Sequence, residues 1–358
     1  MKQAMQGAQV VRWTPRAVGF VAAVGLLVLL LAFGPLFMRP EILDRLTTLF
    51  IYVLLAAMWN ALAGYGGLVS IGQQAFIGLG GYFLVRLSAG GMDVYAALLV
   101  SVLLVGLVSL PLGQIMLKLG GGEFAIGMWV LAELLHLLVT IDPIVQGETG
   151  TSLLGIDAYA PAVRRADTYW MALGLVVVLL GVLFVLLRSR VGASLQAVRD
   201  DETAAASIGV NVLRSKNVLF LLSAVGCAAA GAVWLAQSVT FQPATYFGPQ
   251  WTAYMLFMTV VGGLGTFEGP VIGAVMFFLA ETYFGSTGVA YLIGLGGLAV
   301  GFALLFPKGI WGAVETRFPV RLIPIGYHLR FPPTRGVSRL GKAIVDGLPD
   351  AVDPPPSG

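Results

Sequence analysis

A succession of apolar runs, each nearly as long as a membrane is thick, constrains this chain more than any other feature. A helix needs about 20 mostly apolar residues to cross a bilayer. About ten runs approach this length: 17–37, 46–63, 68–88, 95–117, 123–141, 168–187, 217–237, 251–266, 270–285 and 288–306. Charged residues make up 11% of the chain, against roughly 25% in soluble domains. The sequence therefore predicts an all-α polytopic membrane protein with about ten transmembrane helices, including glycine-rich interrupted spans.

Lysine and arginine at the ends of these runs predict the orientation, because cytoplasmic loops are enriched in both. The outer side receives few of them if both termini are cytoplasmic: Arg39, Arg45, Arg164 and Arg165, with Arg86 near that face. The run at 17–37 follows basic residues and lacks a clear cleavage site, so we expect a retained span. The predicted division is a cytoplasmic segment 1–16, a transmembrane domain 17–306, and a cytoplasmic, basic, partly disordered tail 307–358. The formal net charge of +3 does not indicate a nucleic-acid partner.

One polar interruption, residues 188–216, stands out on the predicted inner side. Val191, Leu195 and Val198 recur there at helical spacing. A second short helix fits residues 201–208, because an aspartate can cap its start and Gly209 can end it in a left-handed conformation. We expect an exposed face of three consecutive alanines, Ala204 to Ala206, that another protein could approach closely. The alternative is an ordinary solvated loop.

Two glycine clusters, residues 64–72 and 262–269, interrupt hydrophobic regions. Interrupted spans at corresponding places in two halves of a chain indicate a transport site, whereas small residues that only let helices pack closely are the alternative. The predicted substrate path comprises Ser70, Gly72, Gln73, Gln74, Gly262, Gly263, Gly265 and Thr266. The two glutamines can donate and accept hydrogen bonds, either to a polar solute or between helices.

The order of residues in four segments resembles one family. The stretch G-A-S-L-Q-A-V-R-D-D-E-T-A-A-A-S-I-G-V-N, the early GLVSIGQQAFIGLGGY, the late VGGLGTFEGPVIGA and the closing FPKGIWG resemble permease subunits of branched-chain amino acid ABC importers. The resemblance covers residues 45–312. Two departures concern Thr203, which interrupts an E-A-A…G signature, and the pair Gln73 and Gln74, which stands where relatives often have His and Ala.

The resemblance implies that residues 188–216 dock on an ATPase subunit. The implied coupling residues are Arg199, Asp200, Asp201, Glu202, Ala204, Ala205 and Gly209. It also implies a homologous permease partner, two ATP-binding subunits, a periplasmic solute-binding protein and a location in the bacterial inner membrane. The implied solute is a branched-chain amino acid or another small polar molecule, since relatives also carry urea, short amides and aromatic acids. We expect replacements that alter shape at Ala205 or Gly209 to harm transport more than Arg199→Ala.

Acidic residues and a histidine lie within or beside apolar runs. A charge in mid-membrane is costly, so we expect Glu123, Glu133, His136 and Glu281 to face the bundle interior. Glu133 and His136 share a helix face, which indicates a structural pair or a role in gating; the other histidine lies in the tail, so no metal site is expected. Cys227 lies in an apolar run, where we expect a packing residue.

Alternative functions fit the sequence less well. The segment 336–342 matches a P-loop pattern, but Ala343 replaces the Ser or Thr that would bind magnesium. We therefore expect no cofactor on this chain, with ATP bound by partner subunits. A secondary transporter of small solutes would need a mid-membrane coupling group, for which Glu133 is the candidate. A membrane enzyme is disfavoured, because neither a zinc-protease nor a nucleophile motif is present.

Overall fold

The computed structural model describes residues 9–11, 15–285, 288–306, 308–317 and 328–330. The helices are α2 (Pro15–Ala32), α3 (Gly34–Phe37), α4 (Pro40–Asn60), α5 (Gln74–Ala89), α6 (Val94–Met116), α7 (Gly121–Thr140), α8 (Pro161–Arg188), α9 (Arg190–Asp200), α10 (Glu202–Ser207), α11 (Val212–Ser238), α12 (Pro243–Tyr246), α13 (Gln250–Gly262), α14 (Gly269–Phe284), α15 (Val289–Leu305) and α16 (Gly309–Arg317). Short elements are the π-helical turn η1 (Ala61–Tyr65), the 3-10 turns η2 (Gly147–Thr149) and η3 (Ile156–Ala158), and strands β1 (Gln9–Val11), β2 (Thr151–Ser152), β3 (Thr240–Phe241) and β4 (His328–Arg330).

Helices α4 and α11 form the centre of the bundle. Both are buried over most of their length, whereas α2, α7, α8 and α15 expose much of their apolar surface. Helix α11 packs against α4, α5, α6 and α8, and α4 also contacts α13 and α14. Cys227 is fully buried in α11, so its predicted role as a packing residue is confirmed.

Each predicted apolar run coincides with a helix, and the run 17–37 is divided into α2 and α3, but the helices differ in length. In the part of the chain that is described, six are long and apolar enough to cross a membrane: Pro40–Tyr65, Val94–Met116, Gly121–Thr140, Pro161–Arg188, Val212–Ser238 and Ile293–Arg317. Ala17–Ala32 and Gly269–Phe284 are shorter apolar helices. Helices α5 and α13 are short because the glycine clusters cut into the runs. The chain is thus an all-α polytopic membrane protein.

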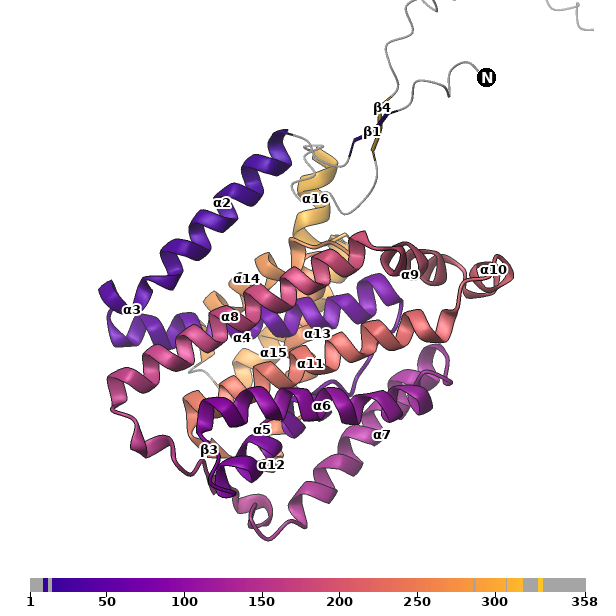
Figure 1. Cartoon of the computed structure of the whole chain (residues 1–358). Coiled ribbons are helices and arrows are strands. Elements are labelled where there is room, and N and C mark those ends of the chain that lie inside the picture. The colour runs from indigo at the N-terminus through magenta and orange to yellow at the C-terminus, as the bar shows by residue number, and fades with distance from the viewer. Residues whose placement is uncertain (1–8, 12–14, 286–287, 307, 318–327, 331–358) are drawn as a thin grey trace, which may run out of the picture.

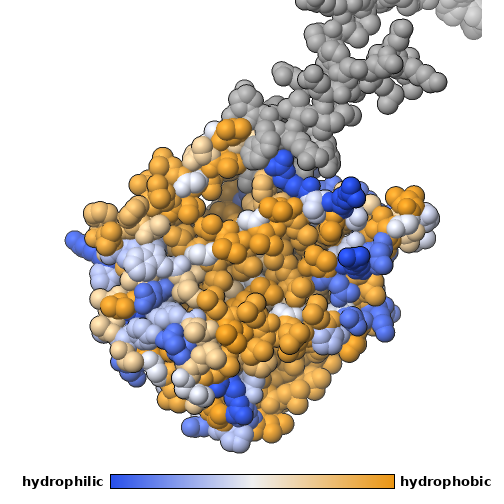
Figure 2. Space-filling model, in the orientation of Figure 1, coloured by the Kyte–Doolittle hydropathy of each residue, from blue (hydrophilic) through white to orange (hydrophobic). Residues whose placement is uncertain are grey.

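The surface has the distribution expected for a protein surrounded by lipid. Figure 2 shows a broad hydrophobic area across the body, with hydrophilic residues gathered on opposite sides of it. Large apolar side chains, including Leu30, Leu103, Val130 and Val185, are more than half exposed. Such an area would be unfavourable in water and is stabilised by contact with hydrocarbon or another subunit.

Two antiparallel strand pairs join segments that are distant in sequence. Strand β1 pairs with β4, with Gln9 opposite Arg330, so these two segments near the ends of the chain lie side by side (Figure 1). Strand β2 pairs with β3, with Thr151 opposite Phe241, which joins the loop after α7 to the segment after α11. The predicted disorder in the tail concerns residues that lie outside the described ranges.

Candidate functional site

The first glycine cluster begins where the central helix α4 changes geometry. After Asn60 the helix continues as the π-helical turn η1 and then becomes irregular until α5 begins at Gln74. Turns of this kind within helices are frequent at functional sites. Gly67 has φ +68, a left-handed conformation that favours glycine. The predicted interruption at 64–72 is therefore confirmed.

The second glycine cluster separates α13 from α14. Gly263 and Gly265 have φ values of +130 and +77, so the chain turns sharply between the two helices. Thr266 stabilises this turn: its Oγ1 donates to the carbonyl of Gly263 at 2.7 Å and accepts from the amide of Gly269 at 3.1 Å. The predicted interruption at 262–269 is confirmed as well.

The two interruptions contact each other directly. The buried side chain of Asn60 donates to the carbonyl of Thr266 at 2.8 Å and accepts from the amide of Gly265 at 2.8 Å. A Cβ on Gly64 would lie 2.6 Å from the Gly265 nitrogen, so only glycine fits there. We call this contact of Asn60, Gly64, Gly265 and Thr266 the glycine junction.

Arg199 connects the polar interruption to the glycine junction. From the end of α9 its Nη1 donates to the carbonyl of Gly64 at 2.8 Å, and its stem lies against Gly67. Its side chain is 39% exposed, and it also contacts Asp200 at 3.3 Å. Arg199 therefore points partly inward, and its guanidinium joins the end of α9 to the glycine junction.

We call α9, α10 and their flanking residues, 188–216, the coupling segment. Its predicted caps are confirmed: Asp201 accepts from the amide of Ala204 at 2.9 Å, and Gly209 ends α10 with φ +87. The predicted exposure of the three alanines is wrong for Ala205, which is 2% exposed. The helix is only about one and a half turns long, so Ala205 is the residue that it turns toward the body. Glu202 pairs with Lys216 at 2.6 Å, and so closes α10 onto α11.

The polar residues of the predicted path divide into two groups. Ser70 and Thr266 bond to their own turns: the Ser70 hydroxyl accepts from the amide of Gly72 at 3.3 Å, and Thr266 binds as described above. Ser70 is also fully buried. The structure thus gives both hydroxyls a turn-stabilising role, which the sequence interpretation had missed.

Gln73 and Gln74 lie together at the start of α5, and both are buried. The Gln74 side chain accepts from the hydroxyl of Thr252 on α13, as the helix-to-helix alternative predicted. Both polar atoms of the Gln73 amide lack a hydrogen-bond partner among the described residues. A buried, unpaired amide is unfavourable by about 1–3 kcal/mol, so Gln73 is unusual among the predicted path residues.

Two of the predicted path glycines are required for packing. A Cβ on Gly72 would lie 1.9 Å from the carbonyl oxygen of Met128 on α7, and one on Gly262 would lie 1.9 Å from the carbonyl oxygen of Gly269. Any side chain at Gly72 would displace α7. Glycines in α15 differ, because a Cβ on Gly297 or Gly301 would meet nothing within 4 Å.

Glu133 and His136 form the predicted pair on α7, with 3.5 Å between Nδ1 and Oε1. The other ring nitrogen lies 3.0 Å from Glu148, and the ring stacks on Phe247. The expectation of an interior position is wrong for Glu133, whose side chain is 59% exposed, and for the exposed Glu123. Glu123 lies in the first turn of α7, and both residues belong to a peripheral helix that is only 28% buried.

Other acidic groups have identified partners. Glu281 turns toward α4 and accepts a hydrogen bond from Tyr52. Beyond the end of α7, the hydrogen bond from Tyr82 is the main reason that the pKa of the Asp142 carboxyl lies below its ordinary value. Asp142 also accepts from the amide of Ile144 at 3.0 Å. These contacts join the ends of α5 and α7 on the side opposite to the coupling segment.

The sequence analysis missed Asn60, which joins the glycine junction. The sequence did indicate that Asn60 is unusual, because it is the one side-chain amide between Leu49 and Gly72. Trp59, which donates to the carbonyl of Ser70 at 2.9 Å, was missed for the same reason: both residues lie inside a run that was interpreted only as a span.

Broken helices that meet inside an all-helical bundle are typical of membrane transport proteins. Comparison with known families identifies the type: residues 42–306 match the family described as branched-chain amino acid transport system, permease component, and the chain belongs to this family. It is 27% identical over 314 residues to the high-affinity branched-chain amino acid transport system permease protein LivM of Escherichia coli, covering 80% of this chain and 73% of the relative. LivM of Salmonella typhimurium is 27% identical over 294 residues, with coverages of 75% and 69%. No solved structure matches the chain significantly.

Proposed function

We propose that the chain is the membrane-spanning permease subunit of an ABC importer. It would pass a branched-chain amino acid or a related small polar solute from a periplasmic binding protein across the bacterial inner membrane, driven by ATP hydrolysis on separate subunits. Family membership and the transport function named for both relatives support this function. The expected partners are a homologous permease, two ATP-binding subunits and the binding protein. No nucleic-acid partner and no cofactor of its own are part of the proposal.

The observation that carries the coupling mechanism is the hydrogen bond from Arg199 to Gly64. It joins the coupling segment, proposed to dock on an ATPase subunit, to the contact between the two broken spans. Movement of α9 and α10 would then pull on the backbone of Gly64 and alter its packing against Gly265. Capped helices suit this role, because a rigid element transmits displacement that a flexible loop would absorb.

We place the substrate path next to Gln73, where α5, α7 and α13 meet. Gly72 lies against α7 and Gln74 bonds to α13, so Gln73 lies between two helices that would separate when the path opens. Its unpaired amide could then bind the polar groups of a passing solute. In the structure, neither polar atom of this amide has a partner among the described residues.

Gln73→Leu is expected to slow uptake without reducing stability, because it removes an unpaired buried amide that costs about 1–3 kcal/mol. Gln74→Leu is the matched control: it breaks the bond to Thr252 and is expected to lower the unfolding temperature. Uptake into proteoliposomes and thermal unfolding in detergent measure the two effects. Wild-type uptake by Gln73→Leu would show that this amide does not contact the solute.

We also propose about ten membrane crossings with both termini and the coupling segment in the cytoplasm. The division into residues 1–16, 17–306 and 307–358 is part of this proposal. The helix order supports it: α8 ends at the coupling segment, and α11 runs from that segment to the opposite side. There, Glu148 binds the amide of Ala244.

Reporters placed along the chain test this orientation. A fusion after Gly209 is expected to be cytoplasmic, and fusions near Gln146 and Pro243 are expected to be external. A fusion after Lys342, which lies outside the described residues, is expected to be cytoplasmic too. Cysteine accessibility from either side of sealed vesicles gives an independent measurement. An external Gly209 would contradict the coupling mechanism.

Reconstitution tests the proposed function as a whole. Purified alone, the chain is expected neither to hydrolyse ATP nor to concentrate solute, since ATP binding is assigned to partner chains. Together with the homologous permease, two ATP-binding subunits and the binding protein, it is expected to take up branched-chain amino acids when ATP is supplied. Uptake by the single chain, driven by an ion gradient, would instead identify a secondary transporter.

A further inference from the structure

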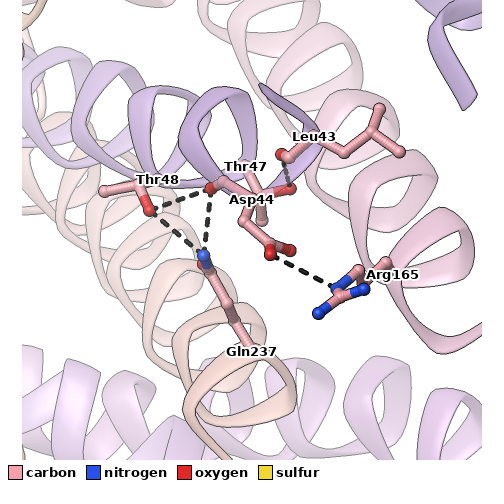
Figure 3. Close-up of polar contacts among 6 residues, drawn as sticks. All are labelled: Leu43, Asp44, Thr47, Thr48, Arg165 and Gln237. Carbon is pink, nitrogen blue, oxygen red and sulfur yellow. Dashed lines mark hydrogen bonds and ion pairs between the residues drawn. The ribbon is translucent and has the colours of Figure 1, made fainter. Parts of the chain in front are cut away.

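A polar pocket lies at the end of the bundle opposite to the coupling segment. It forms between the N-terminal parts of α4 and α8 and the last turn of α11, and it has a volume of about 240 Å³. Its lining is almost entirely polar: Asp44, Thr47, Arg164, Arg165, Thr168, Ala236 and Gln237. Figure 3 shows the Asp44, Arg165 and Gln237 side chains converging there from three helices.

The acidic and basic groups of the pocket are only partly paired. Arg165 Nε lies 3.3 Å from Asp44 Oδ2, and the two side chains are 40% and 42% exposed. No hydrogen bond or ion pair of the Arg164 guanidinium is found among the described residues. One carboxylate and two guanidinium groups therefore line the same small space, and one guanidinium is free.

Gln237 supplies a second unused group. Its Nε2 donates to the carbonyl of Asp44 at 3.0 Å and to the hydroxyl of Thr48 at 3.2 Å. Because a carbonyl only accepts, this bond fixes which end of the amide is the nitrogen. The Oε1 atom is buried and has no donor among the described residues. It can therefore accept a hydrogen bond from a ligand.

We propose that this pocket binds the charged head group of a free α-amino acid. Arg164 would bind the carboxylate through its planar pair of N–H donors, and Asp44 with Gln237 Oε1 would accept hydrogen bonds from the ammonium. The volume is below the roughly 300–1,000 Å³ typical of pockets for drug-sized ligands, which suits a small solute. The inference deepens the proposed transport function and rests on it for the choice of an amino acid.

The lining also predicts what the pocket does not recognise. Ala236 is the one apolar residue of the lining, so no apolar pocket exists there for a branched side chain. That side chain would extend toward the open mouth. Binding should therefore depend on both charged groups of the amino acid and only weakly on the identity of its side chain.

The purified transporter complex, without the binding protein, tests the proposal by isothermal titration calorimetry. The probes are L-leucine, L-alanine, 4-methylpentanoate, which lacks the ammonium, and 3-methylbutylamine, which lacks the carboxylate. Leucine and alanine are expected to bind with similar affinity, and either analogue at least ~10-fold more weakly, which corresponds to loss of one charged hydrogen bond. Arg164→Gln is expected to weaken leucine binding at least ~10-fold.

The control is Arg45→Gln. Arg45 is an exposed arginine at the same end of α4, and it does not line the pocket. It is expected to leave leucine binding unchanged. Absence of leucine binding in a complex that still transports leucine would overturn the pocket and leave the proposed function intact. Equal leucine binding by wild type and Arg164→Gln would overturn the pocket too. The pocket would also be overturned if no leucine binding were measured and Arg164→Gln lost docking of the binding protein. Leucine and alanine binding in a complex that transports neither would support the pocket and contradict the function.

Discussion

Gly64→Val is expected to abolish solute uptake. The added Cβ would lie 2.5 Å from Asn60 Oδ1 and 2.6 Å from the Gly265 nitrogen. The Asn60 amide is held by its two hydrogen bonds, and the Gly265 nitrogen belongs to the backbone, so neither atom can move aside freely. The second glycine cluster would have to shift, which breaks both hydrogen bonds of Asn60. Overpacking of this kind costs about 1–3 kcal/mol, and occasionally more. Each ~1.4 kcal/mol corresponds to a tenfold change in the population of the packed arrangement that holds Gly64 against Gly265.

Gly174→Val in α8 is the matched control, because a Cβ at Gly174 meets nothing within 4 Å. Uptake into proteoliposomes and gel filtration of the complex should be measured for both variants. The control is expected to transport normally. Gly64→Val is expected to remain associated with its partners through its intact outer surfaces, yet to fail in transport. Normal uptake by Gly64→Val would mean that transport does not require the close contact between Gly64 and Gly265 in the glycine junction.

Gly72→Leu would be a less informative variant, although Gly72 belongs to the predicted substrate path, because Gly72 packs against the backbone of Met128. A side chain there would push α7 outward and disturb folding. Gly64 is the sharper position, since it touches the second glycine cluster itself.

Local features of this fold could be predicted from the sequence. Helical runs, glycine interruptions and the caps at Asp201 and Gly209 depend on residues close together in the chain, so periodicity and capping chemistry identify them. The helices α5 and α13 are shorter than predicted for a related reason. The glycine turns use residues that a count of apolar length assigns to the spans.

Contacts between distant segments could not be predicted in the same way. Asn60 and Gly265 are 205 positions apart, and nothing in the local pattern of either one indicates the other. The direction of Arg199 depends on how α9 packs against α8, α11 and η1, and the burial of Ala205 depends on which way a short helix rotates. For Ser70 and Thr266 the local pattern was misleading. Their polar side chains suggested a substrate path, whereas their hydrogen bonds stabilise the turns in which they lie.

Arg199→Ala is expected to reduce transport strongly while the ATP-binding subunits remain bound. Sequence reasoning ranked this change below changes at Ala205 and Gly209, because surface ion pairs contribute only about 0–1 kcal/mol. The structure gives Arg199 a different partner, the carbonyl of Gly64 at 2.8 Å. A hydrogen bond from a charged group contributes about 1.5–3 kcal/mol. Partial exposure of Arg199 favours the lower end, which corresponds to roughly a 10-fold loss of coupling.

Three further variants separate coupling from docking. Arg214→Ala removes an exposed arginine from the same segment and is expected to transport normally. Ala205→Trp is expected to lose the ATP-binding subunits, because a bulky side chain cannot fit where Ala205 is 2% exposed and would force α10 away from the body. Arg199→Lys is expected to recover only part of the activity, since a lysine lacks the planar donor group of arginine.

Pull-down of the ATP-binding subunits and solute-stimulated ATP hydrolysis, measured on the same reconstituted complexes, distinguish these outcomes. Arg199→Ala should retain association and basal hydrolysis while losing most of the stimulation by solute. The reason is that the proposed docking surface of α10 would be intact, whereas its movement would no longer be transmitted to the backbone of Gly64. If Arg199→Ala instead releases the ATP-binding subunits, the arginine belongs to the docking surface. If stimulation is unchanged, force reaches the glycine junction by another route, for which the packing of α16 against Gly263 is the next position to test.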